Sequence, residues 1–484
     1  MVPPERVRLV NPSPERPDAA WVLYWMTAFR RTRHNHALEH AVARARALGL
    51  PLLVLEAIGV DHPWACRRFH RFVLDGMRDN AARLGEAYYP YVERAPGEGR
   101  GLLAALAGRA AVVVADDWPS LHLPQLVAAA GRLDVRVEAV DANGLLPLVS
   151  GPLTPAPSAH TFRRLLQKEL PRHLRELPLA DPLVDLPSRA PQVPGAITDR
   201  WKPGFDIDPS HLPIDAEVGP VAAFPGGETA AHARLAGFLA RIDAYATDRN
   251  DPDADASSGL SSYLHWGHIG THGVVEALFR QEGWTPDRVS AGGNGSREGW
   301  WHVSPAAEGF LDELVTWREL GFNWALRRPG ANGWSSVPGW ARATLEAHAV
   351  DPRPHAYTFE QLEAADTHDP LWNAAQTQLR EEGRIHNYMR MLWGKKVLEW
   401  SPTPEEAARR LVALNDRWAL DGRDPNSYNG IYWVFGRCDR PWGPERPVYG
   451  TIRYMTSENT RRKLNLERWL TRWSPGRQAP LMFR

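Results

Sequence analysis

Short apolar runs alternate with longer amphipathic segments in the first third of the chain. The apolar runs have the length and the aliphatic or aromatic content of buried strands, and they lie at residues 21–25, 50–55 and 111–115. Between them, His36–Leu48 and Phe69–Leu84 repeat apolar residues at helical spacing. Strands separated by amphipathic helices predict a parallel sheet with helices on both faces, so we expect an α/β domain over residues 1–143.

The pattern then changes twice. Residues 144–225 are rich in proline, which disfavours regular helices, except around Phe162–Leu170. Beyond Gly226 the apolar spacing is helical almost throughout. Thr403 precedes two glutamates and predicts the start of a helix that runs to Leu414. We therefore expect a linker followed by an all-α domain over residues 226–484.

Composition narrows the possible functions only slightly. The 484 residues are 43% hydrophobic, enough for two or three domains, and 21 of them are tryptophans, most of which we expect in the core. A formal net charge of zero argues against indiscriminate coating of nucleic acid, although basic residues outnumber acidic ones from Gly436 onward.

The remaining bulk features point to an ordinary intracellular protein. No apolar run reaches the roughly 18 residues of a membrane helix, and the N-terminus lacks a basic and then apolar signal, so we expect a cytoplasmic protein. Cys66 and Cys438 match no metal or redox spacing, and we expect two ordinary thiols and no metal site.

Four motifs between Asp366 and Tyr454 carry the strongest functional signal. They are Thr-His-Asp-Pro-Leu-Trp-Asn-Ala-Ala-Gln at 367–376, His-Asn-Tyr-Met-Arg-Met-Leu-Trp-Gly-Lys-Lys at 386–396, Leu-Asp-Gly-Arg-Asp-Pro-Asn-Ser-Tyr-Asn-Gly at 420–430 and Asp-Arg-Pro-Trp-Gly at 439–443. In order and spacing this set resembles the flavin-binding half of class II cyclobutane pyrimidine dimer photolyases, within the photolyase and cryptochrome family. The resemblance implies a Rossmann-like antenna-type domain at 1–143, a long linker at 144–225 and an all-α FAD-binding domain at 226–484.

The resemblance is looser in the first domain. Tyr24-Trp25-Met26, Arg33-His34-Asn35 and Arg68–Phe72 match the family, but His34 stands where an acidic residue is usual. This domain carries the antenna chromophore in relatives that have one. An 8-hydroxydeazaflavin-type antenna, an empty site and a purely structural domain all remain open at this point.

The resemblance also assigns residues to FAD. A hydroxyl-rich loop resembles the family's phosphate loop through Ser257, Ser258, Leu260 and Ser261, and Tyr245 stands at the first flavin-contacting tyrosine. Arg390 and Asp421 match an ion pair beside the flavin ring, with Asn387 one helical turn before Met391. Asn415 matches the asparagine that faces flavin N5, where a neutral amide can accept a hydrogen bond from a protonated nitrogen or donate one to a deprotonated nitrogen.

A second set of residues is assigned to the DNA lesion. Glu313 and Trp317 are four residues apart and are expected to share a helix face. Glu313 resembles the carboxylate that contacts the dimer, Trp317 and Trp433 its aromatic walls, and Met391 a contact from the flavin side. Arg440 lies in the motif that enters the DNA bubble left by the flipped dimer.

Three tryptophans complete the assignment. Trp393 and Trp400 are two helical turns apart. With Trp372 they resemble the class II electron-transfer chain, in which Trp393 is nearest the flavin, Trp372 lies in the middle and Trp400 lies toward solvent. The same spacing is typical of an aromatic core seam. The two interpretations are compatible, because burial supplies the close packing that electron transfer requires.

The resemblance implies a monomeric enzyme that binds UV-damaged DNA and repairs cyclobutane pyrimidine dimers by electron transfer from light-excited, reduced FAD. Such a protein would be nucleoid-associated in a prokaryote. The main alternative is a cryptochrome-like blue-light photoreceptor. Repair of the (6-4) photoproduct would need an acidic histidine, for which His265 and His386 are candidates, and a DNA-binding module without catalysis is the last alternative.

Overall fold

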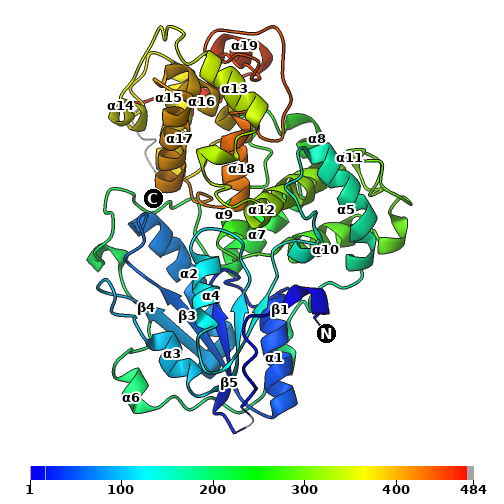
Figure 1. Cartoon of the computed structure of the whole chain (residues 1–484), viewed down its shortest axis with the longest axis vertical. Helices are drawn as coiled ribbons and strands as arrows, with labels where there is room; N and C mark the ends of the chain where they lie inside the picture. The colour runs from blue at the N-terminus through cyan, green and yellow to red at the C-terminus, as the bar shows by residue number, and fades with distance from the viewer. Residues whose placement is uncertain (1, 17, 477–484) are drawn as a thin grey trace.

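The computed structural model describes residues 2–16 and 18–476. A sheet built from the first 140 residues forms one end of the molecule, and the helices of the later residues form the other (Figure 1). The predicted combination of an α/β region and an all-α region is therefore confirmed. The exact boundaries at residues 143 and 225 stay a prediction.

The sheet has six strands in the order β1-β6-β5-β2-β3-β4. They are β1 (Val7–Leu9), β2 (Trp21–Met26), β3 (Leu52–Ile58), β4 (Tyr88–Val92), β5 (Ala110–Asp116) and β6 (Arg136–Val140). All neighbouring pairs are parallel except β1 and β6, so the predicted parallel sheet is confirmed, with one antiparallel strand added at its edge. β1, β4 and β6 were not predicted, because all three strands are short. In addition, β4 contains a proline, and charged residues interrupt the apolar ones in β6.

Successive side chains of the central strands enter different cores, as strand geometry requires. Val22 and Tyr24 face α1 (His36–Leu48), whereas Trp21 and Leu23 face α3 (Leu102–Ala107). The other helices of this region are α2 (Arg67–Leu84) and α4 (Leu123–Ala130). The predicted bounds of α1 are confirmed, because Asn35 caps its start through the N–H groups of Ala37 and Leu38 and Gly49 ends it with φ 64°.

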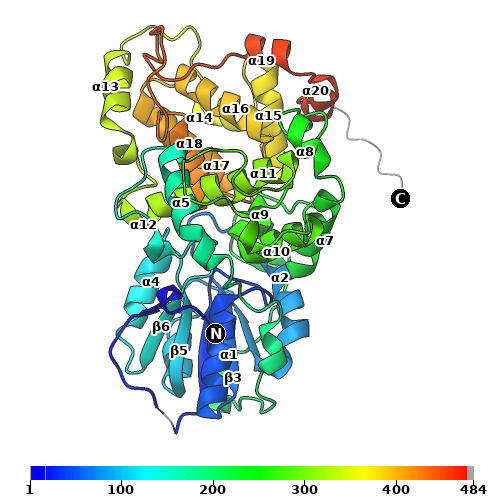
Figure 2. The ribbon, with the colours of Figure 1, turned by 90° about the vertical axis from the view of Figure 1, so that its right-hand side faces the viewer.

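The predicted linker is not a detached tether. Its main helix, α5 (Ala159–His173), is longer than predicted and continues through Pro171 in its last turn. It packs against the helical region, as the turned view shows (Figure 2). Further along, α6 (Gly195–Thr198) leads to Trp201, which is buried in the core beside α3. The segment therefore wraps back over the α/β region and contributes to its core.

The helical region follows. Its helices are α7 (Glu228–Leu239), α8 (Asp243–Asp248), α9 (Ser261–His265), α10 (Thr271–Gln281), α11 (Pro305–Leu311), α12 (Arg318–Arg327), α13 (Gly339–Ala347), α14 (Phe359–Glu363), α15 (Pro370–Glu382), α16 (Asn387–Trp400), α17 (Pro404–Trp418), α18 (Pro425–Trp433), α19 (Ser457–Lys463) and α20 (Glu467–Trp473). Thr403 caps α17 as predicted, through the N–H of Glu406, but the helix extends past Leu414 to Trp418. None of the helices within the described ranges combines the length and apolar character needed to cross a bilayer.

A π-helical turn, Asp312–Trp317, joins α11 to α12. Such a turn has i→i+5 hydrogen bonds and often lies at functional sites. Glu313 and Trp317 therefore lie in a π-helical turn and not in the regular α-helix that we expected. Residues four apart still point to nearly the same side, because four residues fall just short of one full turn of a π-helix and just beyond one full turn of an α-helix.

The two regions meet where backbones touch. A Cβ atom on Gly226 would overlap the carbonyl oxygen of Phe72, and one on Gly267 would overlap that of Ala28. Around this contact lie three buried histidines, His36 from the first region and His268 and His272 from the second. Burial lowers the pKa of His268 to about 3, and it holds the pKa values of His36 and His272 well below the usual range, with the nearby Arg6 and Arg31 acting in the same direction on both.

These histidines predict acid sensitivity. We expect the free energy of unfolding to be highest above about pH 6.5, the ordinary pKa of histidine, and to fall below it, because the unfolded chain then binds protons that the buried rings exclude. The loss is about 1.4 kcal/mol per pH unit for each such ring. In urea unfolding at about pH 7 and about pH 5.5, His268→Asn should reduce this pH dependence, whereas His211→Asn at an exposed position should not. An equal pH dependence in both variants would contradict this account.

Candidate active site

Three of the predicted flavin residues meet although they come from distant segments. An Nη2 of Arg390, on α16, lies 3.0 Å from an Oδ1 of Asp421, in the turn between α17 and α18. Burial opposes ionisation of Asp421, yet Arg390 and the nearby Ser261 hydroxyl hold the pKa of its carboxyl below the usual range. The carboxylate is therefore ionised, and the pair keeps a fixed positive group at this position.

Asn415 lies in the last turns of α17 and is 3% exposed. Its Nδ2 donates to Asp416 Oδ1 and to Ser427 Oγ, each at 3.0 Å. Asp416 and Ser427 were not identified from the sequence. An aspartate or a serine does not by itself indicate a flavin site. The available clues were that Asp416 is next to the predicted Asn415 and that Ser427 lies within the motif at 420–430.

The predicted phosphate loop is held by local hydrogen bonds. The N–H of Leu260 donates to Ser258 Oγ at 3.4 Å, and Ser257 Oγ donates to Asp255 at 3.4 Å. Leu260 is 1% exposed and its side chain belongs to the hydrophobic core beneath the loop. Arg384 pairs with Asp255 at 2.9 Å, which balances a negative charge that the sequence places in this loop.

Tyr245 and Glu313 are brought together by a residue that sequence reasoning missed. Arg249 lies 3.3 Å from Glu313 through Nη1, and its guanidinium carbon lies 5.6 Å from the Tyr245 ring centre. Glu313 keeps 37% of its side chain accessible. Burial of the carboxyl among protein atoms nevertheless raises its pKa, and Arg249 opposes that rise. Tyr245 itself is buried, and burial raises the pKa of its phenol.

The predicted lesion and DNA residues include a stacked basic cluster. Lys395 Nζ lies 5.2 Å and the Arg453 guanidinium 5.5 Å from the Trp433 ring centre. Arg453 also lies 4.9 Å from the ring of Trp442, and Arg440, which is exposed, lies 4.3 Å from it. Cations over tryptophan faces hold both partners in place. Asn387 is exposed and Trp317 and Met391 are half-buried, so all three remain accessible to a ligand.

Not every basic residue from Gly436 onward is available to phosphates. Arg437 is 1% exposed and donates to the Ala331 carbonyl and the Ser336 hydroxyl. The part of the stretch beyond residue 476 lies outside the described residues.

The three tryptophans are in contact. Trp372 Nε1 donates to the Trp393 carbonyl at 3.0 Å, and the rings of Trp372 and Trp400 are 5.5 Å apart. Trp400 is 0% exposed, so its expected place toward solvent was wrong. Tyr357 and His368 pack on its ring at 5.2 and 5.4 Å and cover it.

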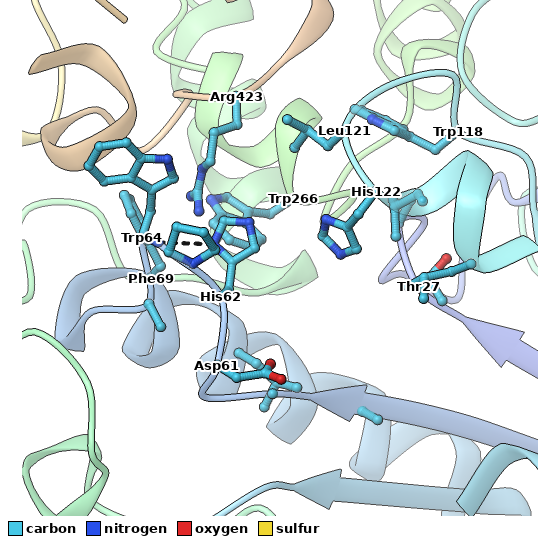
Figure 3. A pocket seen from close by; sticks show the side chains of 18 of the residues that line it. Thr27, Asp61, His62, Trp64, Phe69, Trp118, Leu121, His122, Trp266 and Arg423 are labelled. Atoms are coloured by element: carbon cyan, nitrogen blue, oxygen red, sulfur yellow. Dashed lines mark hydrogen bonds between the residues drawn. The ribbon is translucent and has the colours of Figure 1, made fainter. Parts of the chain in front are cut away.

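A cavity of about 1100 Å³ lies between the sheet and the helical region. Trp64, Phe69, Trp118 and Trp266 are among its walls, and the rings of His62 and His122 are 5.5 Å apart within it (Figure 3). Arg423 stacks on Phe69 at 4.1 Å, and its buried Nε and Nη2 atoms have no hydrogen-bond partner. None of the residues that the sequence assigned to FAD or to the cyclobutane dimer lines this cavity, and all of them lie within the described part of the chain. His265, the candidate for a (6-4) lesion, does line it.

Away from this cavity, three side chains that could in principle bind a metal ion lie close together within the described residues. Glu5, His173 and Glu176 have possible ligand atoms within 4.8 Å of one another. However, Arg172 Nε donates to His173 Nε2 at 3.0 Å, which leaves the ring proton on Nδ1, the nitrogen that faces Glu5. Nδ1 lies 3.8 Å from the Glu5 carboxylate and makes no hydrogen bond. The absence of a metal stays a prediction.

The fold resembles that of solved photolyase and cryptochrome structures. A class III photolyase from Agrobacterium tumefaciens superposes with a TM-score of 0.63 at 18% identity, over 87% of this chain and 80% of its own. A cryptochrome from Synechocystis superposes with a TM-score of 0.65 at 17% identity, over 94% of this chain and 88% of its own. The architecture is therefore that of photolyases and cryptochromes.

Comparison with curated proteins extends this result. No family model matches the chain. A deoxyribodipyrimidine photo-lyase from Methanothermobacter thermautotrophicus is 34% identical over 98% of both chains, and one from Oryza sativa is 37% identical over 96% of this chain and 90% of its own. One from Potorous tridactylus is 31% identical over 97% of this chain and 85% of its own. The chain belongs to the deoxyribodipyrimidine photo-lyase family, which confirms the predicted family and enzyme class.

Family membership implies FAD, and the donor set fits it. Arg390 and Asp421 keep 18% and 14% of their side chains accessible, and Ser261 and Asn387 are exposed. A guanidinium, a hydroxyl and amides are the groups expected along the polar edge of a flavin ring. These residues would hold the isoalloxazine, with the loop at Ser257 and Ser258 supplying hydroxyl donors for the pyrophosphate.

Loss of the Arg390 charge tests this arrangement. Arg390→Met leaves the Asp421 carboxylate without its cation, and we expect a loss of about 1–3 kcal/mol in unfolding free energy together with weaker FAD retention. Arg390→Lys keeps a charge and should recover much of the stability. Urea unfolding and the flavin-to-protein absorbance ratio measure the two effects. Parental FAD retention in Arg390→Met would remove this residue from the flavin site.

Proposed function

We propose that this protein is a class II enzyme that repairs cyclobutane pyrimidine dimers in DNA with light. The observation that carries the proposal is the meeting of Arg390, Asp421 and Ser261 from three separate segments, next to the helix that bears Asn415. Glu313, Trp317, Met391 and Trp433 retain the types that a dimer pocket needs. We expect a monomer in the cytoplasm, nucleoid-associated in a prokaryote.

Bound FAD, when reduced and excited by near-UV or blue light, supplies one electron to the dimer. The protein binds and orients both reactants. Arg390 keeps positive charge beside the flavin, since Asp421 fixes its guanidinium through the 3.0 Å contact. Exclusion of water by the surrounding buried helices strengthens these electrostatic contacts.

On the lesion side, a dimer pairs poorly, so its extrusion from the duplex costs less than that of two normal pyrimidines. Trp317 and Trp433 would provide stacking walls for the flipped dimer, and Met391 would pack against it. The Glu313 carboxyl, held by Arg249 at 3.3 Å and 37% accessible, is the group that would hydrogen-bond to the pyrimidine edge of the dimer. Arg440 and Arg453 are placed to contact the surrounding DNA.

Two alternatives make different demands on the site. Repair of a (6-4) photoproduct needs an acidic histidine, but burial lowers the pKa of His386 to about 4, so this ring is neutral at physiological pH. His265 lines the interdomain cavity, where it lies 3.3 Å from Asp424. A cryptochrome-like photoreceptor is compatible with the fold, but would not need the accessible Glu313 and Trp433 to recognise a lesion.

We further propose that the interdomain cavity binds an antenna chromophore of the 8-hydroxydeazaflavin type. Its aromatic walls suit a planar ring system. Burial and the nearby Arg423 charge lower the pKa of His62 to about 4, so this ring is a neutral hydrogen-bonding group. The unpaired Arg423 nitrogens suit an anionic oxygen on the ligand.

The deciding experiment illuminates the reduced protein with an oligonucleotide that contains one thymine dimer and follows the return of thymine absorbance. Light-dependent recovery supports dimer repair. FAD binding without recovery on this substrate would favour the photoreceptor, and the absence of both would favour a module without catalysis.

Glu313→Ala should retain FAD and reduce the repair yield. It removes a hydrogen bond to the dimer, and the loss of one such charged contact costs about 2–3 kcal/mol. The yield per absorbed photon and lesion binding are measured with pre-reduced enzyme. Glu298→Ala, at an exposed glutamate, is the control and should leave the yield unchanged. Parental repair by Glu313→Ala would move the dimer pocket elsewhere.

Trp372→Phe should separate photoreduction from repair. Phenylalanine is much harder to oxidise than tryptophan but conserves most of the packing volume, so the variant should lose about 1 kcal/mol of stability and fail to photoreduce oxidised FAD. Supplied with chemically reduced FAD, it should repair dimers at nearly the parental rate. Trp284→Phe replaces another buried tryptophan, which stacks on Phe279 at 3.8 Å, and should photoreduce normally. Normal photoreduction in Trp372→Phe would place the electron path elsewhere.

Reconstitution tests the antenna. The protein should bind 8-hydroxy-5-deazariboflavin, and excitation of that ligand should drive repair through energy transfer. Arg423→Leu should weaken binding at least about tenfold, the loss expected for one charge-assisted contact. Arg200→Leu removes an arginine that stacks on Trp201 outside the cavity and should bind normally. No binding by the parent protein would leave the cavity without this chromophore while the repair assay stands.

A further inference from the structure

Asp416 is a buried carboxylate that joins three segments of the helical region. It lies near the end of α17 and is 2% exposed. Oδ1 accepts from Asn415 Nδ2 at 3.0 Å and from the Arg423 N–H at 3.1 Å, and Oδ2 accepts from the Tyr428 hydroxyl at 2.8 Å. These bonds connect α17 to the following turn and to α18, so the carboxylate has little freedom to move.

The contact with Asp416 decides which way the Asn415 amide points. The oxygen and nitrogen of an asparagine side chain are nearly equal in shape, and only the partners distinguish them. An ionised carboxylate is an acceptor only, so it must face the NH₂ group. The Ser427 hydroxyl lies 3.0 Å from the same nitrogen and 3.3 Å from the amide oxygen. Both N–H groups are thus engaged, and the oxygen is the atom with an unused lone pair.

We propose that Asp416 is a positioning residue that fixes the Asn415 amide so that its oxygen, rather than its nitrogen, is offered to the flavin. The inference rests on the proposed function, in which Asn415 faces the flavin ring. An oxygen accepts a hydrogen bond from a ring N–H but repels a bare nitrogen lone pair. The orientation of the amide therefore biases the bound flavin between its redox forms, which differ in protonation at that nitrogen.

The surroundings of Asp416 support this role. Burial raises the pKa of the carboxyl, and bonds from Tyr428, Asn415 and the Arg423 N–H, together with the Arg423 charge, oppose the rise. The Arg423 charge and the two bonds to Oδ1 are enough to stabilise the ionised, acceptor-only form on which the amide orientation depends, and they do not involve the Tyr428 bond to Oδ2. Asp416 also lines the interdomain cavity together with Arg423 and Tyr428, so one carboxylate lies between the two cofactor sites of the proposed function.

Asp416→Asn provides the test. The new amide can donate as well as accept, so it no longer forces the Asn415 nitrogen to face it. FAD binding should persist. The separation between the two one-electron midpoint potentials of bound FAD should change by at least about 59 mV, which corresponds to a tenfold change in the equilibrium constant between the redox forms. Spectroelectrochemical titration measures both potentials without DNA or light.

Tyr428→Phe is the matched control. It removes a hydrogen bond from the other oxygen of the same carboxylate and leaves the contact with Asn415 in place. Its stability should fall, but the separation of the potentials should stay within about threefold of the parent, about 28 mV. Equal shifts in both variants would overturn the proposal, because they would show a general loosening of the site.

Parental potentials in folded, FAD-bound Asp416→Asn would also overturn it. If that variant does not fold, Asp416→Glu keeps the charge but displaces the carboxylate by one methylene, and unchanged potentials in it would have the same meaning. Failure of the proposed function is a separate result, because the parent protein would then lack FAD or light-dependent repair, whereas the potentials of these variants depend only on the bound flavin.

Discussion

The structure depends on close contact between the backbones of its two regions. At Gly226 and Gly267 the helical region approaches Phe72 and Ala28 so closely that no side chain fits between them. Any Cβ there would have to displace main chain, which is far less adaptable than a side chain. Because Gly267 lies two residues beyond the end of α9, this contact holds the end of the helix that begins with Ser261 against the α/β region. The interdomain cavity is the space left beside it.

The turn between α17 and α18 carries this constraint to the flavin residues. The Trp266 indole donates to the Leu420 carbonyl at 2.9 Å, and the Leu420 N–H donates to the Gly383 carbonyl at 2.8 Å. Asp421 in the same turn reaches Arg390 on α16. These bonds fix three parts of the helical region relative to one another. The parts are the end of α9, the turn between α15 and α16, and the turn between α17 and α18. Residues that would contact FAD and residues that line the cavity alternate along this one turn.

Buried arginines hold the remaining parts together. Arg6 donates to the carbonyls of Gly144 and Leu145, and Arg68 donates to those of Gly219 and Trp418. Each guanidinium joins segments that are remote in sequence, and its rigid set of donors matches several carbonyl oxygens at once. Removal of such a side chain would leave buried carbonyls unpaired, which makes these contacts specific as well as stabilising. The zero net charge of the chain gives no indication of them.

The sequence by itself determined the elements and the family. Helical periodicity and an asparagine cap defined α1, apolar runs located three strands, and four motifs selected the residues that meet around Arg390 and Asp421. Only the tertiary structure decided the π-helical turn at Glu313, its link to Arg249, the burial of Trp400 and the place of Asp416 between two sites. Periodicity and caps are set by neighbours within a few residues of each other. Burial, ion pairing and amide orientation depend on side chains brought together from distant segments, and no local pattern encodes those partners.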